Sequence, residues 1–250
     1  MATGSGRPDL KLRRAAQFAD ELRGAVNEYR FGNNFHVEQA LDERQETIDF
    51  TLRVSTPPPL DAWSLLLGDC VHNLRAALDH LAWQLDSKPD SGTAFPIRLS
   101  PPNQWPPACV ARMNPEAQLL IDAVQPHWEE LAGRYPVRHP LATLHALDID
   151  DKHKVLIGTA QALSGDSIIG IPFGAGVEHV VAAPFADGSQ MGRMRFPDGV
   201  VTPVEFKAHF QLVLTEEPWV HADVMWILDE VLMKWIPDVV ITPLRPFARN

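Results

Sequence analysis

The chain has 250 residues, 45% of them hydrophobic and 22% charged, which is ordinary for a globular protein with a real core. The 22 Lys and Arg against 32 Asp and Glu give a formal net charge of −10, which argues against a broad surface for nucleic acids or anionic membranes. No apolar run approaches the ~20 residues of a membrane span, and the first residues lack the apolar core of a secretory signal, so we expect a cytoplasmic protein without a membrane segment.

A helix and a hairpin are the first predicted elements. Apolar residues recur at helical spacing from Pro8 to about Arg30, and Gly32 with two asparagines ends this helix. Apolar and polar residues then alternate along two consecutive runs within 35–54. Because a strand turns successive side chains to opposite faces, this alternation predicts a β-hairpin with one buried face.

The stretch 60–85 has the longest clean helical pattern in the chain. Steps of three and four residues separate its apolar positions, which places them on one helical face. These positions are Leu60, Trp63, Leu67, Cys70, Leu74, Leu78, Leu81 and Leu85. Three prolines at 57–59 precede the pattern and fix its start, since proline does not fit a helix interior. We expect this helix to organise the helical part of the fold.

Loops and shorter helices follow. Residues 86–114 are rich in proline and are predicted to be a loop, which Phe95-Pro96-Ile97 anchors to the core. A helix is predicted from Pro115 to about Leu131, with a kink or an end at Pro126. A second helix begins at Pro140.

The chain from 154 to 214 is predicted to be rich in strands. The best of them is 204–214, in which apolar and polar residues alternate. A closing helix is predicted at 218–236, followed by an extended tail. Helices gather in 8–150 and strands in 154–214, without βαβ alternation. The sequence therefore predicts a single α+β domain over 1–250, in which a helical layer led by helix 60–85 packs on a mainly antiparallel sheet.

Polar residues are dense on helix 60–85. At roughly 100° per residue, one flank of its apolar stripe carries Gly68, His72, Arg75 and Asp79. Asp69, Asn73 and His80 fall further round the back. Ionisable groups on a half-buried helix must be paired, and such clusters often form sites. The cluster comprises Asp69, His72, Asn73, Arg75, Asp79 and His80. A second cluster comprises His145, Asp148, Asp150, Asp151, Lys152 and His153. We expect a site where these two clusters meet.

Arg75 and His80 form the pattern R-x4-H, which resembles the signature of the HEPN ribonucleases, small helical proteins that usually dimerise and cut RNA without a metal. The resemblance implies that His80 moves the proton of the ribose 2′-hydroxyl or of the leaving oxygen, and that Arg75 holds the scissile phosphate. It implies RNA as a partner and a possible homodimer, since residues about 140° apart on one helix converge only across a groove or a dimer axis. His72 and Asp79 join them as catalytic candidates. The binding candidates are Asn73, His145, Lys152 and His153.

A metal-dependent hydrolase is the first alternative. A carboxylate and an imidazole stand three residues apart in both clusters, and two helices that each offer such a pair can enclose Zn²⁺, Mn²⁺ or Fe²⁺ and activate water. The candidate ligands are Asp69, His72, Asp79, His145, Asp148 and Asp151. The sequence contains no HExxH motif and does not specify a cofactor.

A non-enzymatic structural or ligand-binding module is the second alternative. In this hypothesis the polar residues form a buried network that pins the turn after residue 150 to helix 60–85. Its members are His72, Arg75, Asp79, Lys152 and His153. Loss of such a network lowers stability, whereas loss of a catalytic residue lowers activity alone.

Overall fold

The fold was analysed in a computed structural model. The described residues are 7–43, 46–101, 106–151, 159–163, 168–169, 175–179, 182–196, 205–206, 208–214, 219 and 222–249. They divide into two compact units. The helical unit takes its described residues from Met1–Arg23, Ala62–Leu156 and Glu216–Asn250, and the sheet unit takes its residues from Gly24–Asp61 and Ile157–Thr215. The organisation as one domain stays a prediction.

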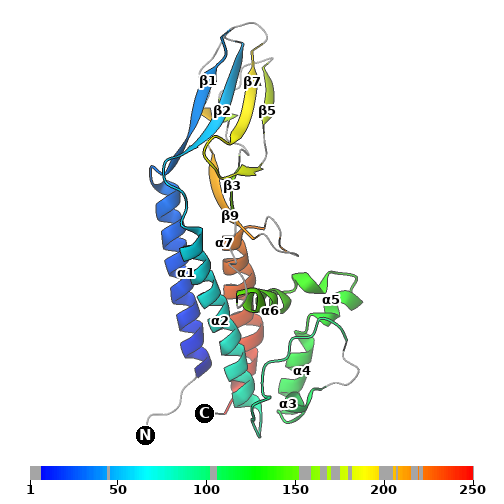
Figure 1. Cartoon of the computed structure of the whole chain (residues 1–250). Helices are drawn as coiled ribbons and strands as arrows, with labels where there is room; N and C mark the ends of the chain where they lie inside the picture. Colours follow the sequence, from blue (N-terminus) through cyan, green and yellow to red (C-terminus); the bar gives the residue numbers. More distant parts are fainter. Residues whose placement is uncertain are drawn as a thin grey trace. The chain divides into compact units, whose positions relative to one another are not determined.

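Helix α2 (Leu60–Leu85) has the bounds that the sequence predicts, and it begins directly after the prolines at 57–59. Its apolar stripe is buried from Trp63 to Leu85, and Leu60 is half-buried. In the helical unit α2 runs beside α1 (Arg7–Phe31), as Figure 1 shows. Lys11 Nζ of α1 donates to Asn73 Oδ1 of α2 at 3.3 Å. These two helices supply much of the unit's buried apolar surface.

Four shorter helices complete the middle of the helical unit. The helix expected at 115–131 is two helices, because Pro126 lacks an N–H and disfavours a helical conformation in the residue before it. Asn114 caps the first of them by accepting from the Glu116 N–H at 2.8 Å. The four helices are α3 (Ala108–Ala111), α4 (Pro115–Ala123), α5 (His127–Leu131) and α6 (Pro140–Asp151).

The closing helix begins later and ends later than 218–236. Asp223 caps its start by accepting from the Trp226 N–H at 2.9 Å. Helical conformation then continues past Pro237 and Pro243, through wider turns of the π type, so the expected extended tail is wrong. Pro237 lies at the start of the second π segment, and Pro243 lies at the start of the α-helical segment that follows it. The successive segments are α7 (Val224–Trp226), η2 (Ile227–Lys234), η3 (Ile236–Ile241), α8 (Thr242–Leu244) and η4 (Arg245–Phe247).

The sheet unit is built on the predicted hairpin. Strands β1 (Phe35–Leu41) and β2 (Thr47–Val54) pair antiparallel, from Phe35 opposite Val54 to Leu41 opposite Ile48. β7 (Gln190–Arg195) and β5 (Gly176–His179) extend them into a sheet of order β1-β2-β7-β5 (Figure 1). One face of this sheet packs into a core that contains Ile48, Phe50, Leu52, Met191, Met194, Phe196 and Phe206.

The strand expected at 204–214 contributes to two different sheets. β8 (Glu205–Phe206) pairs with β4 (Ile168–Ile169), whereas β9 (His209–Val213) pairs with β3 (Thr159–Leu163). β6 (Ala182–Pro184) lies on the other side of β3. Every strand pair in the described residues is antiparallel, and the α+β class is confirmed. No helix in the described part of the chain is both long enough and apolar enough to cross a membrane.

Candidate functional site

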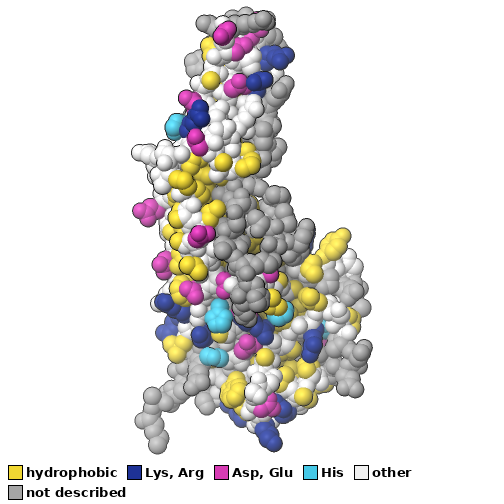
Figure 2. Space-filling model, viewed as in Figure 1, with side chains coloured by type: hydrophobic (Ala, Val, Ile, Leu, Met, Phe, Trp, Pro, Cys, Tyr) yellow, Lys and Arg dark blue, Asp and Glu magenta, His cyan; other side chains and the backbone are white. Residues whose placement is uncertain are grey.

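The polar residues of α2 contact three different neighbours. Because each residue turns by roughly 100°, neighbouring positions on the helix reach different elements. Asn73 contacts α1, His72 contacts α6, and Arg75 with Asp79 contacts the loop after α2. Figure 2 shows histidine, basic and acidic side chains mixed over the lower half of α1 and α2, in Figure 1's orientation. The cluster is therefore several local sites along one helix.

Arg75 and Asp79 together hold the backbone of Phe95. Arg75 Nη2 lies 2.9 Å from Asp79 Oδ1 and donates to the Phe95 carbonyl oxygen at 3.0 Å. The Phe95 N–H donates to Asp79 Oδ1 at 3.0 Å. We call this closed set of contacts the Phe95 clamp. The side chain of Phe95 is fully buried, so the clamp anchors the loop at the point where it enters the core.

The residues after Phe95 are held in the same manner. Gln125, which follows α4, donates from Nε2 to the Pro96 carbonyl at 3.1 Å and accepts from the Arg98 N–H at 3.0 Å. A buried backbone outside a helix or sheet needs partners for its N–H and C=O groups. Side chains from α2 and from the turn after α4 supply them here. The predicted anchoring of this loop at 95–97 thus has a specific hydrogen-bond basis.

The clamp limits what Arg75 can do. The side chain of Arg75 is 14% exposed, and one of its guanidinium nitrogens is already shared between Asp79 and Phe95. A phosphate bound to this guanidinium would compete with the Asp79 carboxylate. His80 directly follows Asp79 on α2, and its side chain is half-buried. Both residues of the R-x4-H pattern lie on α2, and Arg75 already contacts Asp79 and the Phe95 backbone.

His72 pairs with a carboxylate on another helix. Its Nδ1 lies 3.4 Å from Asp148 Oδ1 of α6, a long contact for a hydrogen bond. The His72 side chain is 58% exposed, whereas that of Asp148 is 7% exposed. A buried carboxylate beside an exposed imidazole can orient the ring. This pair is thus the part of the cluster best placed to exchange protons with a bound molecule.

Gly68 permits the close approach of α6 to α2. A Cβ atom at this position would lie 1.9 Å from Oδ1 and 2.6 Å from Cγ of Asp151. Asp151 thus packs directly on the backbone of α2, one helical turn from His72. The absence of a side chain at Gly68 makes room for a carboxylate of this chain.

The remaining predicted site residues differ in their surroundings. Asn73 is buried, and its Nδ2 donates to the Asp69 carbonyl of the same helix at 2.7 Å. Its Oδ1 accepts from Lys11 and so links α2 to α1. The Asp69 side chain is exposed, and His145 is half-buried on α6. Lys152 and His153 lie outside the described residues. The structure brings His72 to Asp148 of α6, whereas Arg75 and Asp79 contact the loop after α2.

Within the described ranges, no group of three or more His, Cys, Asp or Glu side chains is arranged to hold a metal ion. His72 and Asp148 supply two candidate ligands at one place. Structural and catalytic zinc sites use at least three protein ligands. In the described residues, His72 and Asp148 are therefore two candidate metal ligands without a third.

Sequence reasoning did not identify two polar residues of the helical unit, one fully buried and one half-buried. Asp86 is fully buried and accepts from Arg112 Nε and Nη2, which holds the pKa of its carboxyl far below the usual range. His139 precedes α6, and burial lowers the pKa of its imidazole to about 4. A polar residue directly before Pro140, the first residue of α6, is a helix-start signal that could have identified His139.

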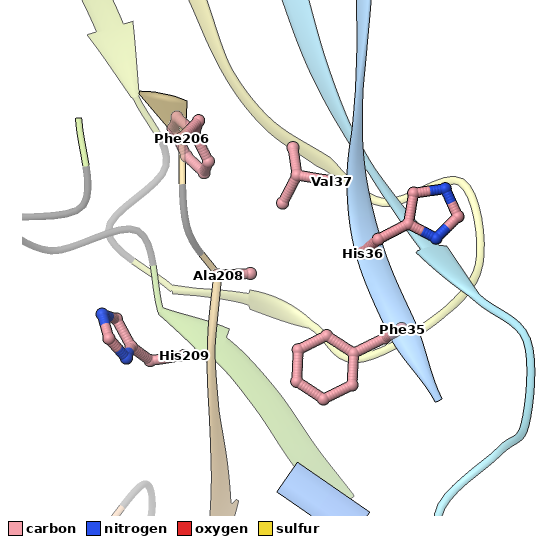
Figure 3. A pocket seen from close by; sticks show the side chains of 6 residues that line it. All are labelled: Phe35, His36, Val37, Phe206, Ala208 and His209. Carbon is pink, nitrogen blue, oxygen red and sulfur yellow. The ribbon is translucent and has the colours of Figure 1, made fainter. Parts of the chain in front are cut away.

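The sheet unit holds a small apolar pocket of about 270 Å³. Figure 3 shows Phe35 and Val37 of β1 facing Phe206 and Ala208 across it, while His36 points to the other side of β1. Pockets that bury a drug-sized ligand usually exceed about 300 Å³ and add a few converging polar groups. This one is smaller, and apolar side chains form its facing walls.

No protein-family model, no curated protein and no solved structure matches this chain.

Proposed function

We propose that this protein is a non-enzymatic structural or binding module in which the polar cluster of α2 serves the fold. The Phe95 clamp carries this proposal. Arg75 and Asp79 contact each other and also take up both backbone groups of one buried loop residue. Groups engaged in this manner are poorly placed to bind a substrate.

The expected energetic effect follows from burial. Breaking a fully buried ion pair by removing one partner costs about 3–5 kcal/mol, whereas exposed pairs contribute about 0–1 kcal/mol. The Arg75 side chain is 14% exposed and that of Asp79 is 34% exposed, so the clamp lies between these limits. We expect its loss to lower the free energy of unfolding by on the order of 2 kcal/mol.

Thermal unfolding of Arg75→Ala and Asp79→Ala tests the proposal, with Arg13→Ala on the exposed side of α1 as the control. A loss of that size lowers the Tm of a chain of this length by roughly 4–8 °C. The control should melt like the wild type. Unchanged melting of both clamp variants would remove the support for a structural role.

Metal-independent RNA cleavage is the second candidate. The contact between the exposed His72 ring and the buried Asp148 carboxylate favours it, because acid/base catalysis needs an accessible imidazole that a second group orients. The R-x4-H resemblance adds His80 as a second proton carrier and Arg75 as a phosphate ligand. Arg75 would then leave Asp79 when RNA binds.

An RNA cleavage assay in the presence of EDTA separates the two candidates. The enzyme hypothesis expects cleavage by the wild type and a loss of about 100-fold or more in His72→Gln or His80→Gln, with unchanged melting. The module hypothesis expects no cleavage above a mock preparation. Cleavage that persists in Arg75→Ala, His72→Gln and His80→Gln alike would come from a contaminant.

A further inference from the structure

A histidine caps the start of α6. His139 Nδ1 accepts from the Leu141 N–H at 3.2 Å, and the His139 carbonyl accepts from the Thr143 N–H at 2.9 Å. Pro140 occupies the first helical position, where its missing N–H costs nothing. Capping positions usually hold Ser, Thr, Asp or Asn. Unlike those side chains, an imidazole loses its acceptor when it binds a proton.

The His139 ring lies in surroundings that oppose a positive charge. It packs edge-on against the Trp235 ring of the closing helix, with ring centres 4.9 Å apart. Burial is the main influence on the ring and disfavours its charged form. Glu129 favours the charged form and Arg134 opposes it, and these two residues also pair with each other. The closing helix contributes an uncharged ring to this contact.

We propose that His139 is an acid-sensitive switch, whose protonation removes the cap of α6 and loosens this helix from the helical unit. Both ring nitrogens of a protonated imidazole are donors, so Nδ1 can no longer accept from Leu141. The new charge also lies at the N-terminal end of α6, where the helix dipole opposes a cation. Both effects act in the same direction.

Release of α6 affects the cluster on α2. α6 carries Asp148 and Asp151, which contact His72 and Gly68 respectively. Thr143, in the first turn of α6, also accepts from Trp219 Nε1 at 3.1 Å. Opening of α6 removes these contacts and exposes the face of α2 around Gly68. This switch is independent of the function proposed above, because it acts through the helix start alone.

The direction of the pH effect follows from the two pKa values of His139. The packed ring has a pKa of about 4, against 6.5 for an exposed histidine. Between these values the opened state binds a proton that the packed state does not, so packing is weakened as the pH falls from 6.5 to 4. A difference of this size raises the opening equilibrium constant roughly 300-fold well below pH 4, and by about half of that at pH 4. Packing is undisturbed above pH 6.5.

Hydrogen exchange of the full chain between pH 7 and pH 4 tests the switch, with rates corrected for the intrinsic pH dependence of exchange. We expect the opening constant of the α6 amides to rise by roughly 100-fold in the wild type. His139→Asn keeps a side-chain oxygen at the cap and does not titrate, so its α6 amides should show no such rise. The buried amides of α2 between residues 74 and 82 provide the internal reference.

The same acid-induced rise in His139→Asn would overturn the proposal, as would a wild-type profile without a rise. Should the Asn variant fail to fold at pH 7, His139→Ser offers a second cap that does not titrate. NMR titration of the wild-type ring is an independent measurement. A His139 pKa near 6.5 in the folded chain would also overturn the switch, and a value well below it supports it.

Discussion

Asp86 illustrates how a single buried charge is accommodated in the helical unit. Its side chain has an exposed fraction of 0%, and Arg112 Nε approaches both carboxylate oxygens at 2.9 and 3.1 Å. Thr93 Oγ donates to Asp86 Oδ2 at 2.8 Å, and the Lys88 N–H donates to Oδ1 at 2.9 Å. The cost of burying the carboxylate is offset because every lone-pair direction has a donor.

We predict that Arg112→Ala lowers the free energy of unfolding by more than the loss of an exposed ion pair does, since it leaves the buried Asp86 carboxylate without its cation. Arg112→Lys should recover part of this loss, because Lys keeps the charge and loses the forked geometry. Urea unfolding at pH 7 measures the effect, with Arg98→Ala as an exposed control. A loss below about 1 kcal/mol would show that the pair behaves like a surface ion pair.

The same pair predicts a pH dependence. Arg112 lowers the pKa of Asp86, so the ionised carboxylate stabilises the folded chain above the ordinary Asp pKa. This stabilisation is lost as the pH falls below that value towards the depressed pKa of the folded state. Asp86→Asn should therefore flatten the acid limb of a plot of unfolding free energy against pH. An unaltered acid limb in this variant would assign the acid sensitivity to other groups.

At the scale of elements, the periodicity of apolar residues predicted correctly those helices and strands that one continuous stretch of sequence defines. Helix 60–85 and hairpin 35–54 match the structure because flanking prolines, or glycine and asparagine, limit an uninterrupted pattern. The prediction of one strand at 204–214 was wrong, because two strands of this stretch pair in different sheets. The alternation of Phe206, Phe210 and Leu212 is the same in both arrangements, so the sequence does not distinguish them.

The candidate site was harder to predict because its contacts join residues far apart in sequence. Helical spacing placed Gly68, His72, Arg75 and Asp79 on one flank of α2, but it could not show that α6 covers one end of this flank and a loop the other. The partner of Arg75 and Asp79 is the backbone of Phe95, which has no side-chain signature. The sequence therefore showed which residues of α2 are polar, but it did not show which partners they contact.

The close approach of α6 to α2 at Gly68 predicts that the effect of Gly68→Ala on stability changes sign between two backgrounds. In the wild type, Gly68→Ala should destabilise the chain, because the new methyl group must displace the Asp151 carboxyl. In an Asp151→Ala background the same substitution should stabilise it by about 1 kcal/mol, the usual gain of Ala over Gly in a helix. A double-mutant cycle by urea unfolding measures both steps. Equal effects of Gly68→Ala in the two backgrounds would contradict the close approach.

At the scale of the whole molecule, each compact unit has its own buried core. The sheet unit centres on Phe50, whose ring stacks on Phe206 with centres 4.6 Å apart. The helical unit centres on the apolar stripe of α2, with Leu74 fully buried. Hydrophobic burial of this kind dominates the stability of each unit.

We predict that core truncations act mainly on the unit that contains them. Phe50→Ala should raise hydrogen exchange in β1, β2 and β7, since truncating a buried Phe costs about 3–5 kcal/mol. Leu74→Ala should raise exchange in α1 and α2 instead, with a cost of about 2–5 kcal/mol. Mass spectrometry of peptides from both units reads the two effects. A uniform rise across both units in each variant would show one cooperative structure.

The division into units has a consequence for synthesis on the ribosome. The helical unit draws on three separated stretches, Met1–Arg23, Ala62–Leu156 and Glu216–Asn250, and the sheet unit draws on two. The apolar face of α2 emerges early, yet Met233, which contacts Cys70 of this face, is translated more than a hundred residues later. Domains usually fold as units during elongation at about 5–20 residues per second. The nascent chain therefore exposes α2 for several seconds, a period in which a chaperone that binds apolar segments would protect it.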